Sequence, residues 1–375
     1  MKTNVVVLHT DYEPMDGVVN PGPHQTYRNP RTSLETRKLG NLHPDEIRVH
    51  MIYGGLCGTD LHLVEKDPDT GYIRSSAPAQ IPPEGRIIGH EGVGRVLAIG
   101  DNVKHLKPGA LVTFESIIIC HYCDICRKGN LNQCRHAKLL GLEKDGIFGT
   151  VVDVPGMLAH DVSAFVKNDK DFKAAACIEP AAVAYVACQN TRIKGGDVVV
   201  IFGAGPIGLF SAMLSKMVFG ASVVHVVEPV EFRRQFAAKW CDHTYDVNEF
   251  FQNNASDVDV VIEASGALDN INKIFRHVNA NGRIALLARS GASLILDSMD
   301  HMITNAISII GSRGHLCGAF IDILSLYQKG RIPLDALVTD VIGSLEDLMQ
   351  LLSSTEKIIN ENCKILVQMD GYPAR

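Results

Sequence analysis

The chain has 375 residues, of which 46% are hydrophobic and 21% are charged. This balance is typical of a globular protein and excludes disordered, fibrous and membrane-embedded classes. A chain of this length is expected to form two domains or slightly more. The formal net charge of -6 is spread without long single-sign runs. We therefore expect small-molecule partners, with no nucleic acid and no membrane among them.

The N-terminal segment and the cysteine content both bear on the cellular compartment. The opening MKTNVVVLHTDYEP turns polar after four apolar residues, which is too short for a signal peptide core or a membrane span. We therefore expect a cytoplasmic protein. In a reducing compartment, ten cysteines favour metal ligands or buried thiols over disulfides. Isolated cysteines such as Cys177 are expected in the core.

The predicted elements change character along the chain. Residues 42–115 contain short β-type runs separated by glycine and proline turns, which is typical of a barrel or a sandwich. From about residue 180, strands alternate with helices, and this pattern predicts a doubly wound parallel sheet of the α/β class. A helical stretch and a short strand complete the chain after about residue 320. The expected strands of the parallel sheet are 197–202, 223–229, 259–265, 282–288 and 306–312.

Two early segments, GLCGTDLH and GHE, place candidate metal ligands beside glycines. A catalytic zinc site needs three protein ligands and one open position for a substrate oxygen. Cys57 and His90 would supply two of the ligands. Glu91, next to His90, or Glu179, in the segment Cys177-Ile-Glu-Pro, would supply the third.

Four cysteines then follow with the spacing C-x2-C-x2-C-x7-C. Four thiolates in one loop match a closed tetrahedral zinc site, which has a structural role because it has no open position. An iron–sulfur cluster also takes four thiolates and is the alternative. Four unrelated core cysteines in so short a window would be an unusual coincidence. The predicted structural zinc ligands are Cys120, Cys123, Cys126 and Cys134.

The segment from Gly203 to Gly208 is a G-x-G-x-x-G motif that follows a predicted strand and opens a predicted helix. In a dinucleotide-binding turn, the glycines permit the turn, the approach of the pyrophosphate and the packing of helix on strand. FAD uses a similar motif, usually near a chain's N-terminus. The predicted cofactor-binding residues of the turn are Gly203, Gly205, Pro206, Ile207 and Gly208.

Glu228 lies twenty residues beyond the last glycine, at the end of the second strand of this domain. A carboxylate at that point binds the adenosine ribose hydroxyls and repels a 2′-phosphate, so we expect NAD rather than NADP. Arg233 is also expected to contact the cofactor. Arg233 and Arg234 lie close in sequence, however, and leave NADP open. A solvent-facing glutamate at a strand end is the structural alternative for Glu228.

In these motifs the sequence resembles the zinc-containing medium-chain dehydrogenase/reductase (alcohol dehydrogenase) family over nearly its whole length. GLCGTDLH, GHEGVGRV, the four-cysteine loop, IEP and GAGPIG occur in that family's order. The resemblance implies a GroES-like β-barrel catalytic domain over residues 1–180 and 322–375. It implies a Rossmann NAD-binding domain over residues 181–321. It also implies two zinc ions per chain and a homodimer or homotetramer, with strand 306–312 as a pairing edge.

The Glu-Pro pair at 179–180 resembles the polyol and sugar dehydrogenase branch, where Glu91 and Glu179 would alternate at the catalytic zinc. The resemblance also implies that Thr59 takes the proton of the alcohol hydroxyl and that His62 relays it. Asp60 would orient His90 through its second ring nitrogen. Without the resemblance, these three residues would be interpreted as a turn hydroxyl, a helix cap and a surface histidine.

The expected reaction is NAD-dependent oxidation of a secondary alcohol in a polyol, sugar or cyclitol, or the reverse ketone reduction. An amino-alcohol dehydrogenase of the threonine 3-dehydrogenase type is the alternative enzyme. A non-catalytic nucleotide-binding protein is disfavoured by the intact ligand set. The segment between His62 and His90 is longer than usual in the family, and Tyr72 and Arg74 in it are candidates for substrate contacts. Thr150 stands where relatives often have a glutamate.

Overall fold

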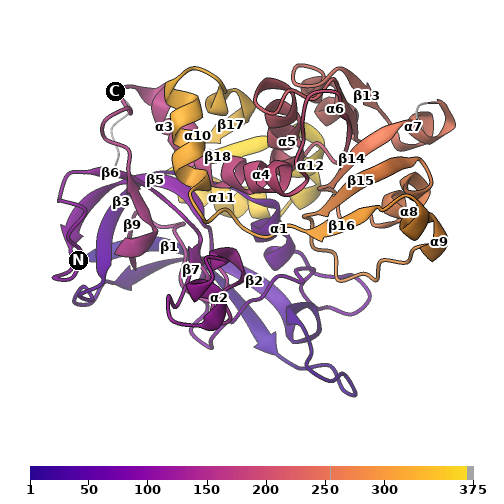
Figure 1. Ribbon diagram of the computed structural model, residues 1–375. Coiled ribbons are helices and arrows are strands. Elements are labelled where there is room, and N and C mark those ends of the chain that lie inside the picture. The colour runs from indigo at the N-terminus through magenta and orange to yellow at the C-terminus, as the bar shows by residue number, and fades with distance from the viewer. Residues whose placement is uncertain (254, 370–375) are drawn as a thin grey trace. The chain divides into compact units, whose positions relative to one another are not determined.

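The computed structural model describes residues 1–253 and 255–369. The chain divides into two compact units (Figure 1). The first unit contains Met1–Glu179, Leu334–Thr355 and the segment that begins at Lys364. The second contains Pro180–Pro333 and Glu356–Cys363.

The division differs from the predicted boundaries near the C-terminus. The sequence analysis assigned residues 322–375 to the first domain, whereas the second unit continues to Pro333 and also includes Glu356–Cys363. Helix α10 (Ala319–Gln328) follows the last strand of the parallel sheet after a short connection. Its side chains Phe320 and Ile323 are fully buried. This apolar face ties the helix to the parallel-sheet unit.

The first unit is built mainly from antiparallel strands. Its larger sheet has the order β10-β6-β5-β3-β18-β17, and β9 also pairs with β3. The pair β17–β18 is the one parallel pair recorded in this sheet for the described residues. Strands β7 (Ile117–Ile118) and β8 (Lys138–Leu139) form a separate hairpin. The strands of the larger sheet are β3 (Glu46–Gly55), β5 (Glu91–Ile99), β6 (Leu111–Phe114), β9 (Val151–Pro155), β10 (Ala159–Asp161), β17 (Val338–Ile342) and β18 (Lys364–Gln368).

Strand β3 is the centre of this sheet because it pairs with β5, β9 and β18. Its pairing with β18 is antiparallel and joins Leu366 to Gly55 in register. A strand from the C-terminal end of the chain therefore lies beside the segment that precedes Cys57. This pairing positions a buried lysine in the site described below.

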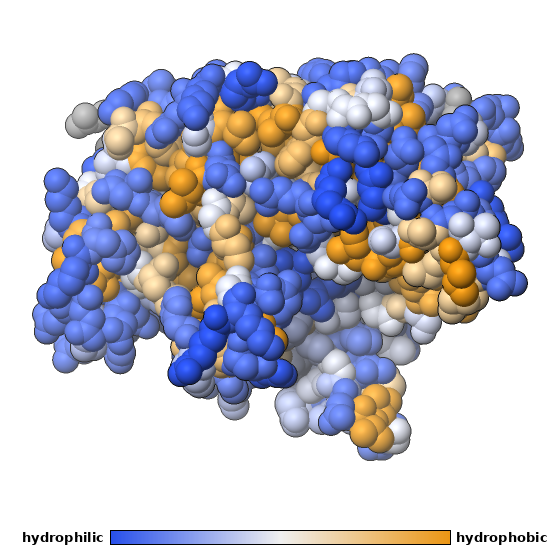
Figure 2. Space-filling view, in the orientation of Figure 1, coloured by the Kyte–Doolittle hydropathy of each residue, from blue (hydrophilic) through white to orange (hydrophobic). Residues whose placement is uncertain are grey.

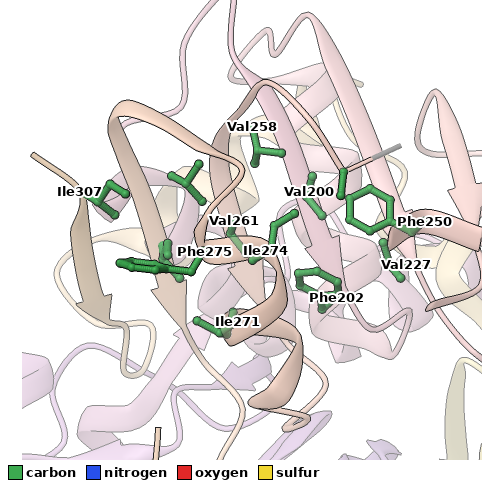
Figure 3. Packing of buried hydrophobic residues seen from close by; sticks show 13 residues of the cluster. Val200, Phe202, Val227, Phe250, Val258, Val261, Ile271, Ile274, Phe275 and Ile307 are labelled. Carbon is green, nitrogen blue, oxygen red and sulfur yellow. The ribbon is translucent and has the colours of Figure 1, made fainter. Parts of the chain in front are cut away.

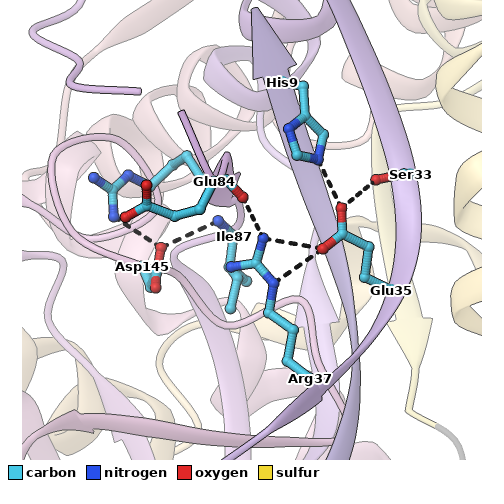
Figure 4. A network of polar contacts seen from close by, with 8 residues as sticks. His9, Ser33, Glu35, Arg37, Glu84, Ile87 and Asp145 are labelled. Carbon is cyan, nitrogen blue, oxygen red and sulfur yellow. Dashed lines mark hydrogen bonds and ion pairs between the residues drawn. The ribbon is translucent and has the colours of Figure 1, made fainter. Parts of the chain in front are cut away.

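The N-terminal hairpin forms a second, three-stranded sheet of β2 (Tyr27–Lys38), β1 (Lys2–Tyr12) and β4 (Arg86–Ile87). Glu35 accepts hydrogen bonds from His9 Nε2 (2.6 Å), Ser33 Oγ (2.7 Å) and Arg37 Nε (3.1 Å) (Figure 4). Burial alone would raise the pKa of Glu35, but these hydrogen bonds lower it to about 2. Arg37 also donates to the backbone of Glu84. The network joins the hairpin to the loop before β4.

The second unit contains a six-stranded parallel sheet with the order β13-β12-β11-β14-β15-β16. This order confirms the predicted Rossmann topology, in which the strand order reverses between β11 and β14. Ligands of such sheets bind at the carboxyl ends of the strands beside that reversal. The strands are β11 (Val198–Phe202), β12 (Val223–Val227), β13 (His243–Tyr245), β14 (Val258–Glu263), β15 (Val278–Leu286) and β16 (Ser308–Gly311).

Alternate residues of the central strand cover the two faces of the parallel sheet. Val200 and Phe202 point into a cluster with Phe250, Ile274 and other apolar side chains from α7 and α8 (Figure 3). On the opposite face, a Cβ added to Gly208 in α5 would lie 3.6 Å from the side chain of Ile201. Both faces are therefore apolar and covered, which explains why the strands appear as continuous hydrophobic runs.

The helices are short in the first unit and mostly flank the parallel sheet in the second. None in the described part of the chain is long and apolar enough to cross a membrane. The first unit has α1 (Gly58–Val64), α2 (Asp124–Arg127), α3 (Asp169–Ala176) and α11 (Leu345–Leu352), with single 3-10 turns at Pro23–Gln25, Leu131–Gln133, Gly156–Leu158 and Leu334–Leu337. The remaining helices are α4 (Ile178–Asn190), α5 (Pro206–Met217), α6 (Glu231–Ala237), α7 (Val247–Asn253), α8 (Asp269–Phe275), α9 (Met299–Thr304) and α12 (Thr355–Glu361).

Candidate functional site

The four cysteines of the C-x2-C-x2-C-x7-C motif converge around α2. Their sulfur atoms all lie within 4.8 Å of one another. The Sγ atoms of Cys120 and Cys134 are 3.6 Å apart. That separation is far beyond a disulfide bond of about 2.05 Å. It is close to the ~3.8 Å expected between two thiolates that bind one zinc ion at about 2.3 Å.

Backbone N–H groups point at these sulfur atoms. Cys123 N donates to Cys120 Sγ, Cys126 N to Cys123 Sγ and Cys120 N to Cys134 Sγ, each at 3.4 Å. The hydrogen bond from Cys126 N is the main cause that lowers the pKa of Cys123 to about 6. These backbone N–H groups stabilise thiolates, and thiolates are the form in which cysteines bind a metal ion. The loop therefore fits the predicted structural zinc.

A second cluster contains Cys57, His90 and Glu91. Cys57 is the N-cap of α1, immediately after β3 and Leu56, while His90 and Glu91 stand at the start of β5. The ligand atoms of these three residues lie within 4.8 Å of one another. His90 and Glu91 are buried. A thiolate, an imidazole and a carboxylate form a donor set that zinc accepts at catalytic sites.

Asp60 holds the two ligand loops together. Its Oδ2 accepts a hydrogen bond from Cys57 N (3.0 Å), and its Oδ1 accepts one from Gly89 N (3.2 Å). The same Oδ1 lies 3.6 Å from Nδ1 of His90, and the carboxylate has no solvent exposure. Burial would lower the pKa of His90, but the negative charges of Asp60 and Cys57 raise it well above its usual value. This negative field favours a bound cation.

The two candidates for the third ligand differ in their surroundings. Glu91 belongs to the cluster, and its Oε1 lies 4.0 Å from Nε2 of His90. Glu179 is also buried, but its Oε1 accepts a hydrogen bond from Ser116 Oγ (2.8 Å). The charge of Glu179 acts on both His90 and Glu91. The structure therefore brings Glu91 into the group and places Glu179 close by on a hydroxyl partner.

Lys364 is a residue of the candidate site that sequence reasoning missed. Its ammonium is fully buried, forms an ion pair with Glu91 Oε2 and donates to Leu56 O at 3.0 Å. Glu91 raises the pKa of Lys364 against the opposing effect of burial. The two partners are 273 residues apart in sequence, and the β3–β18 pairing brings them together. A lone lysine in the apolar run KILVQM gave no local signal of this contact.

The predicted proton relay lies on α1. Thr59 is half-buried, while His62 is exposed and its Nδ1 lies 3.5 Å from Glu65 Oε2. The hydrogen bond from His62 is the main cause that lowers the pKa of Glu65 to about 2. Arg74 Nη1 lies 3.4 Å from the same carboxylate oxygen. Glu65 was not predicted, although its i,i+3 spacing from His62 on a helix is a usable signal.

Tyr72 does not have the exposed position expected of a residue that contacts the substrate. Its hydroxyl donates to Glu13 O at 2.9 Å, and Arg28 lies 5.7 Å from the centre of its ring. The side chain is buried. Tyr72 therefore fastens the inserted segment to the N-terminal hairpin. Arg74, the other candidate in that segment, instead reaches Glu65, the C-cap of α1.

In the second unit, the glycine-rich turn has the geometry that the motif predicts. Gly203 has φ +95°, which favours glycine, and a Cβ on Gly208 would lie 1.9 Å from Gly203 O. Helix α5 begins at Pro206, and its N-cap Gly205 offers no capping side chain. The first-turn N–H groups are thus left for an anionic ligand, as in dinucleotide-binding turns.

Glu228 and Arg233 both border this turn. Glu228 Oε2 accepts a hydrogen bond from Ala204 N (2.7 Å), and its Oε1 accepts one from Val230 N (2.9 Å). Arg233 donates through Nε to Asn362 O (2.9 Å), and its Nη1 would lie 4.0 Å from a Cβ on Gly205. Arg234 instead donates to Glu228 O. The structure thus brings Glu228 and Arg233 to the turn, and Arg234 to the backbone behind it.

Glu263 is a second residue that sequence reasoning missed. It ends β14 and pairs with Phe202 at the end of β11, where the strand order reverses. Its Oε1 accepts hydrogen bonds from Ser265 N and Gly266 N, both at 2.9 Å. Its Oε2 is buried and has no hydrogen-bond partner among the described residues. The sequence could have indicated Glu263, because an acidic residue at the end of a buried strand is unusual.

Comparison with known proteins agrees with this geometry. Residues 43–164 match the alcohol dehydrogenase GroES-like domain, and residues 206–329 match the zinc-binding dehydrogenase domain. L-threonine 3-dehydrogenase of Pyrococcus horikoshii is 32% identical over 79% of this chain and 84% of its own. Scyllo-inosose 3-dehydrogenase of Thermotoga maritima is 31% identical over 76% and 78%. The structure of a candidate alcohol dehydrogenase from Thermotoga maritima has a TM-score of 0.86 and 25% identity, covering 98% and 100%.

The two domain matches, the near-complete coverage and the two ligand clusters define the class. The chain belongs to the zinc-containing medium-chain dehydrogenase/reductase family, with a GroES-like domain and a Rossmann domain. The predicted family and fold class are therefore confirmed. The chain is an oxidoreductase of the zinc-type alcohol and polyol dehydrogenases.

The buried Lys364–Glu91 pair predicts a large loss of stability when one partner is removed. Lys364→Met leaves the Glu91 carboxylate buried without its cation, which should lower the free energy of unfolding by about 3 kcal/mol or more. The double variant Glu91→Gln/Lys364→Met should lose less than the sum of the two single variants. Denaturant titration of all three variants measures this coupling.

Lys173→Met is the matched control, because Lys173 Nζ lies 2.7 Å from Asp169 Oδ2 and both side chains are partly exposed. We expect that surface pair to contribute about 1 kcal/mol or less. Equal losses in the two lysine variants would contradict a stabilising role for the buried pair.

Proposed function

We propose that this protein catalyses the NAD-dependent oxidation of a secondary alcohol in a polyol, sugar or cyclitol, and the reverse reduction of the ketone. The observation that carries the proposal is the cluster of Cys57, His90 and Glu91, fastened by the buried carboxylate of Asp60. The similarity to a cyclitol dehydrogenase supports the substrate class.

Two zinc ions per chain are proposed, one in each cluster. Cys57, His90 and either Glu91 or Glu179 would hold the catalytic ion, and the four cysteines of the loop would hold the structural one. When bound, the catalytic zinc supplies a Lewis acid that lowers the pKa of the alcohol hydroxyl, and NAD supplies the hydride acceptor. The Asp60 carboxylate keeps the loops of Cys57 and His90 at a fixed separation, so the donor set is preorganised.

The proposed proton path runs along one helix of the first unit. Thr59 would accept the hydroxyl proton as it releases its own, and His62, one turn later on α1, would pass a proton to solvent. His62 suits this role because its side chain is exposed. Glu65 holds the ring through Nδ1 and leaves Nε2 to exchange protons.

The cofactor preference is proposed from the turn after β12. The Glu228 carboxylate is fixed by two backbone N–H groups at the edge of the glycine-rich turn. A fixed negative charge there accepts hydrogen bonds from ribose hydroxyls and repels a 2′-phosphate. Arg233, which lies near Gly205, would contact the cofactor on the other side of the turn.

A second candidate is oxidation of an amino alcohol, as in threonine 3-dehydrogenases. It is favoured by the 32% identity to the Pyrococcus horikoshii enzyme over most of both chains. The same donor set and proton path would serve this reaction. A panel of polyols, cyclitols, sugars and L-threonine, followed by NADH formation, separates the two candidates.

Small molecules are the proposed partners, with neither nucleic acid nor membrane among them, and the proposed location is the cytoplasm. We also propose a homodimer or homotetramer that pairs through β16. This strand is an edge of the parallel sheet. Exposed apolar side chains Ile295, Met299 and Ile303 lie on and before the adjacent helix α9, where Figure 2 shows hydrophobic surface. An unpaired strand edge beside apolar surface is typical of a site of association.

Cys57→Ala should abolish turnover and remove one zinc ion. We expect zinc content to fall from two ions to one per chain and NADH formation to fall by about 10³-fold or more, because the Lewis acid is lost. Metal analysis and initial rates measure both effects. Cys177→Ala is the control, since its buried thiol lies outside both clusters. Full turnover by Cys57→Ala would rule out the proposed mechanism.

Glu228→Ala should weaken the preference for NAD. The variant loses the charge that repels a 2′-phosphate, so the ratio of kcat/KM for NAD to that for NADP should fall by about 10-fold or more. Glu228→Gln separates the effect of charge from that of the hydrogen bonds, and Glu231→Ala is a control on the exposed surface of α6. A wild-type enzyme that already prefers NADP would contradict the cofactor assignment.

The oligomer should depend on the surface beside β16. Light scattering should give the mass of a dimer or tetramer for the wild type. Ile303→Glu places a charge on the apolar surface and should shift the protein toward smaller species. Val19→Glu, at another exposed position, in the N-terminal hairpin loop, should leave the mass unchanged. A monomeric wild type at micromolar concentration would disprove the assembly.

A further inference from the structure

Two arginines stand together at the carboxyl edge of the parallel sheet. Arg289 lies three residues beyond the end of β15, and Arg313 lies two residues beyond the end of β16. These strands are neighbours, with Leu286 opposite Gly311, and Ser312 N continues the ladder by donating to Leu286 O at 3.0 Å. Adjacent strands are about 4.8 Å apart, so the two residues leave the sheet side by side.

Neither arginine has an acidic partner in the described part of the chain. Among the described side chains, which exclude those of residues 254, 356, 357 and 370–375, no carboxylate oxygen lies within 4.0 Å of either guanidinium. Other arginines of the same unit are paired, Arg276 with Asp297 and Arg283 with Asp197. Desolvation and the positive charge of Arg313 both lower the pKa of Arg289, so the two cations share one local field.

The acidic residue at the end of the neighbouring strand β14 directs one carboxylate oxygen to the turn that follows it. Glu263 lies at the end of β14, and its carboxylate binds the Ser265–Gly266 turn. Its backbone oxygen accepts the N–H groups of Leu287 and Ala288. Arg289 is exposed and Arg313 is half-buried, so an anion from solvent can reach both guanidinium groups, and two like charges without a counter-charge favour its binding.

The cofactor's own phosphates are accounted for elsewhere. The pyrophosphate belongs at the glycine-rich turn between β11 and α5, and Arg233 lies beside that turn. The arginine pair lies beyond β15 and β16, in the half of the sheet on the other side of the β11–β14 reversal. In a doubly wound sheet, a dinucleotide spans this reversal, so its nicotinamide half is directed toward the β14–β16 edge.

Hydride transfer requires the carbinol carbon to touch the nicotinamide ring, so part of the substrate must lie along the β14–β16 edge. We propose that Arg289 and Arg313 form a subsite for an oxyanion of the substrate, a carboxylate or a phosphate carried by the alcohol. This inference rests on the proposed function and narrows it to an acidic alcohol. Paired guanidinium groups match the planar, multidentate geometry of these anions.

The test uses the full-length, zinc-loaded enzyme and the variants Arg289→Gln and Arg313→Gln. Arg276→Gln is the control, because that arginine is exposed in the same unit and is bound to Asp297. Gluconate and sorbitol 6-phosphate represent anionic alcohols, L-threonine represents a zwitterionic alcohol that carries a carboxylate, and sorbitol and myo-inositol represent neutral ones. Calorimetric titration of the NADH complex with gluconate and with inorganic phosphate measures anion binding without turnover.

We expect the wild type to oxidise an anionic alcohol with a kcat/KM at least about 10-fold above that of the neutral ones. Each variant should raise the KM and the dissociation constant for the anion by about 10- to 100-fold, the cost of a lost charge-assisted hydrogen bond. Turnover of neutral alcohols and the dissociation constant of NADH should not change. Comparing the dissociation constants of gluconate and inorganic phosphate shows whether a carboxylate or a phosphate is preferred.

Three results would overturn the subsite. One is anion binding that is equal in wild type and variants, and another is a wild type that prefers neutral alcohols. The third is weaker NADH binding in the variants, which would assign the arginines to the cofactor. If no alcohol is oxidised but the variants lose anion binding, the proposed function fails while the subsite stands.

Discussion

The hydrogen bonds of the Asp60 carboxylate hold the candidate catalytic centre in place. One oxygen binds the backbone of Cys57 and the other binds Gly89 beside His90. The two ligands come from loops more than thirty residues apart, and neither is held by local structure alone. Because the carboxylate is fully buried, water does not compete for these hydrogen bonds. The separation of the thiolate and the imidazole therefore depends on this side chain together with the β3–β5 pairing, which places Gly55 opposite Glu91.

Burying so much negative charge requires compensation. Cys57, Asp60, Glu91 and Glu179 lie in or near the same cluster of the first unit, and an isolated buried charge is costly. Lys364 supplies a buried cation next to Glu91, and a metal ion would supply the rest. Lys364 reaches this position because β18 pairs with β3, the strand that leads into Cys57. The sheet therefore positions both a ligand loop and its counter-charge.

Different charged and polar groups lie at different positions along the carboxyl edge of the parallel sheet. The glycine-rich turn offers free N–H groups, and the carboxylate of Glu228 is fixed at its border. Glu263 organises the turn at the strand reversal. Beyond β15 and β16, Arg289 and Arg313 add positive charge with no carboxylate within reach among the described residues. Opposite charges thus occupy different stretches of one edge, which suits a ligand with several distinct polar groups.

The sequence by itself determined the family, the fold class and the two short-range motifs. The cysteine loop and the glycine-rich turn were predictable because their residues act through contacts within about fifteen positions. Tertiary structure alone decided the partners of buried charges. Lys364 meets Glu91 across 273 residues, and Tyr72 turns to the N-terminal hairpin rather than to solvent. The choice of Glu91 for the cluster and the assignment of α10 to the second unit also depend on packing. Spacing encodes local geometry, whereas burial and long-range strand pairing arise only when the whole chain has folded.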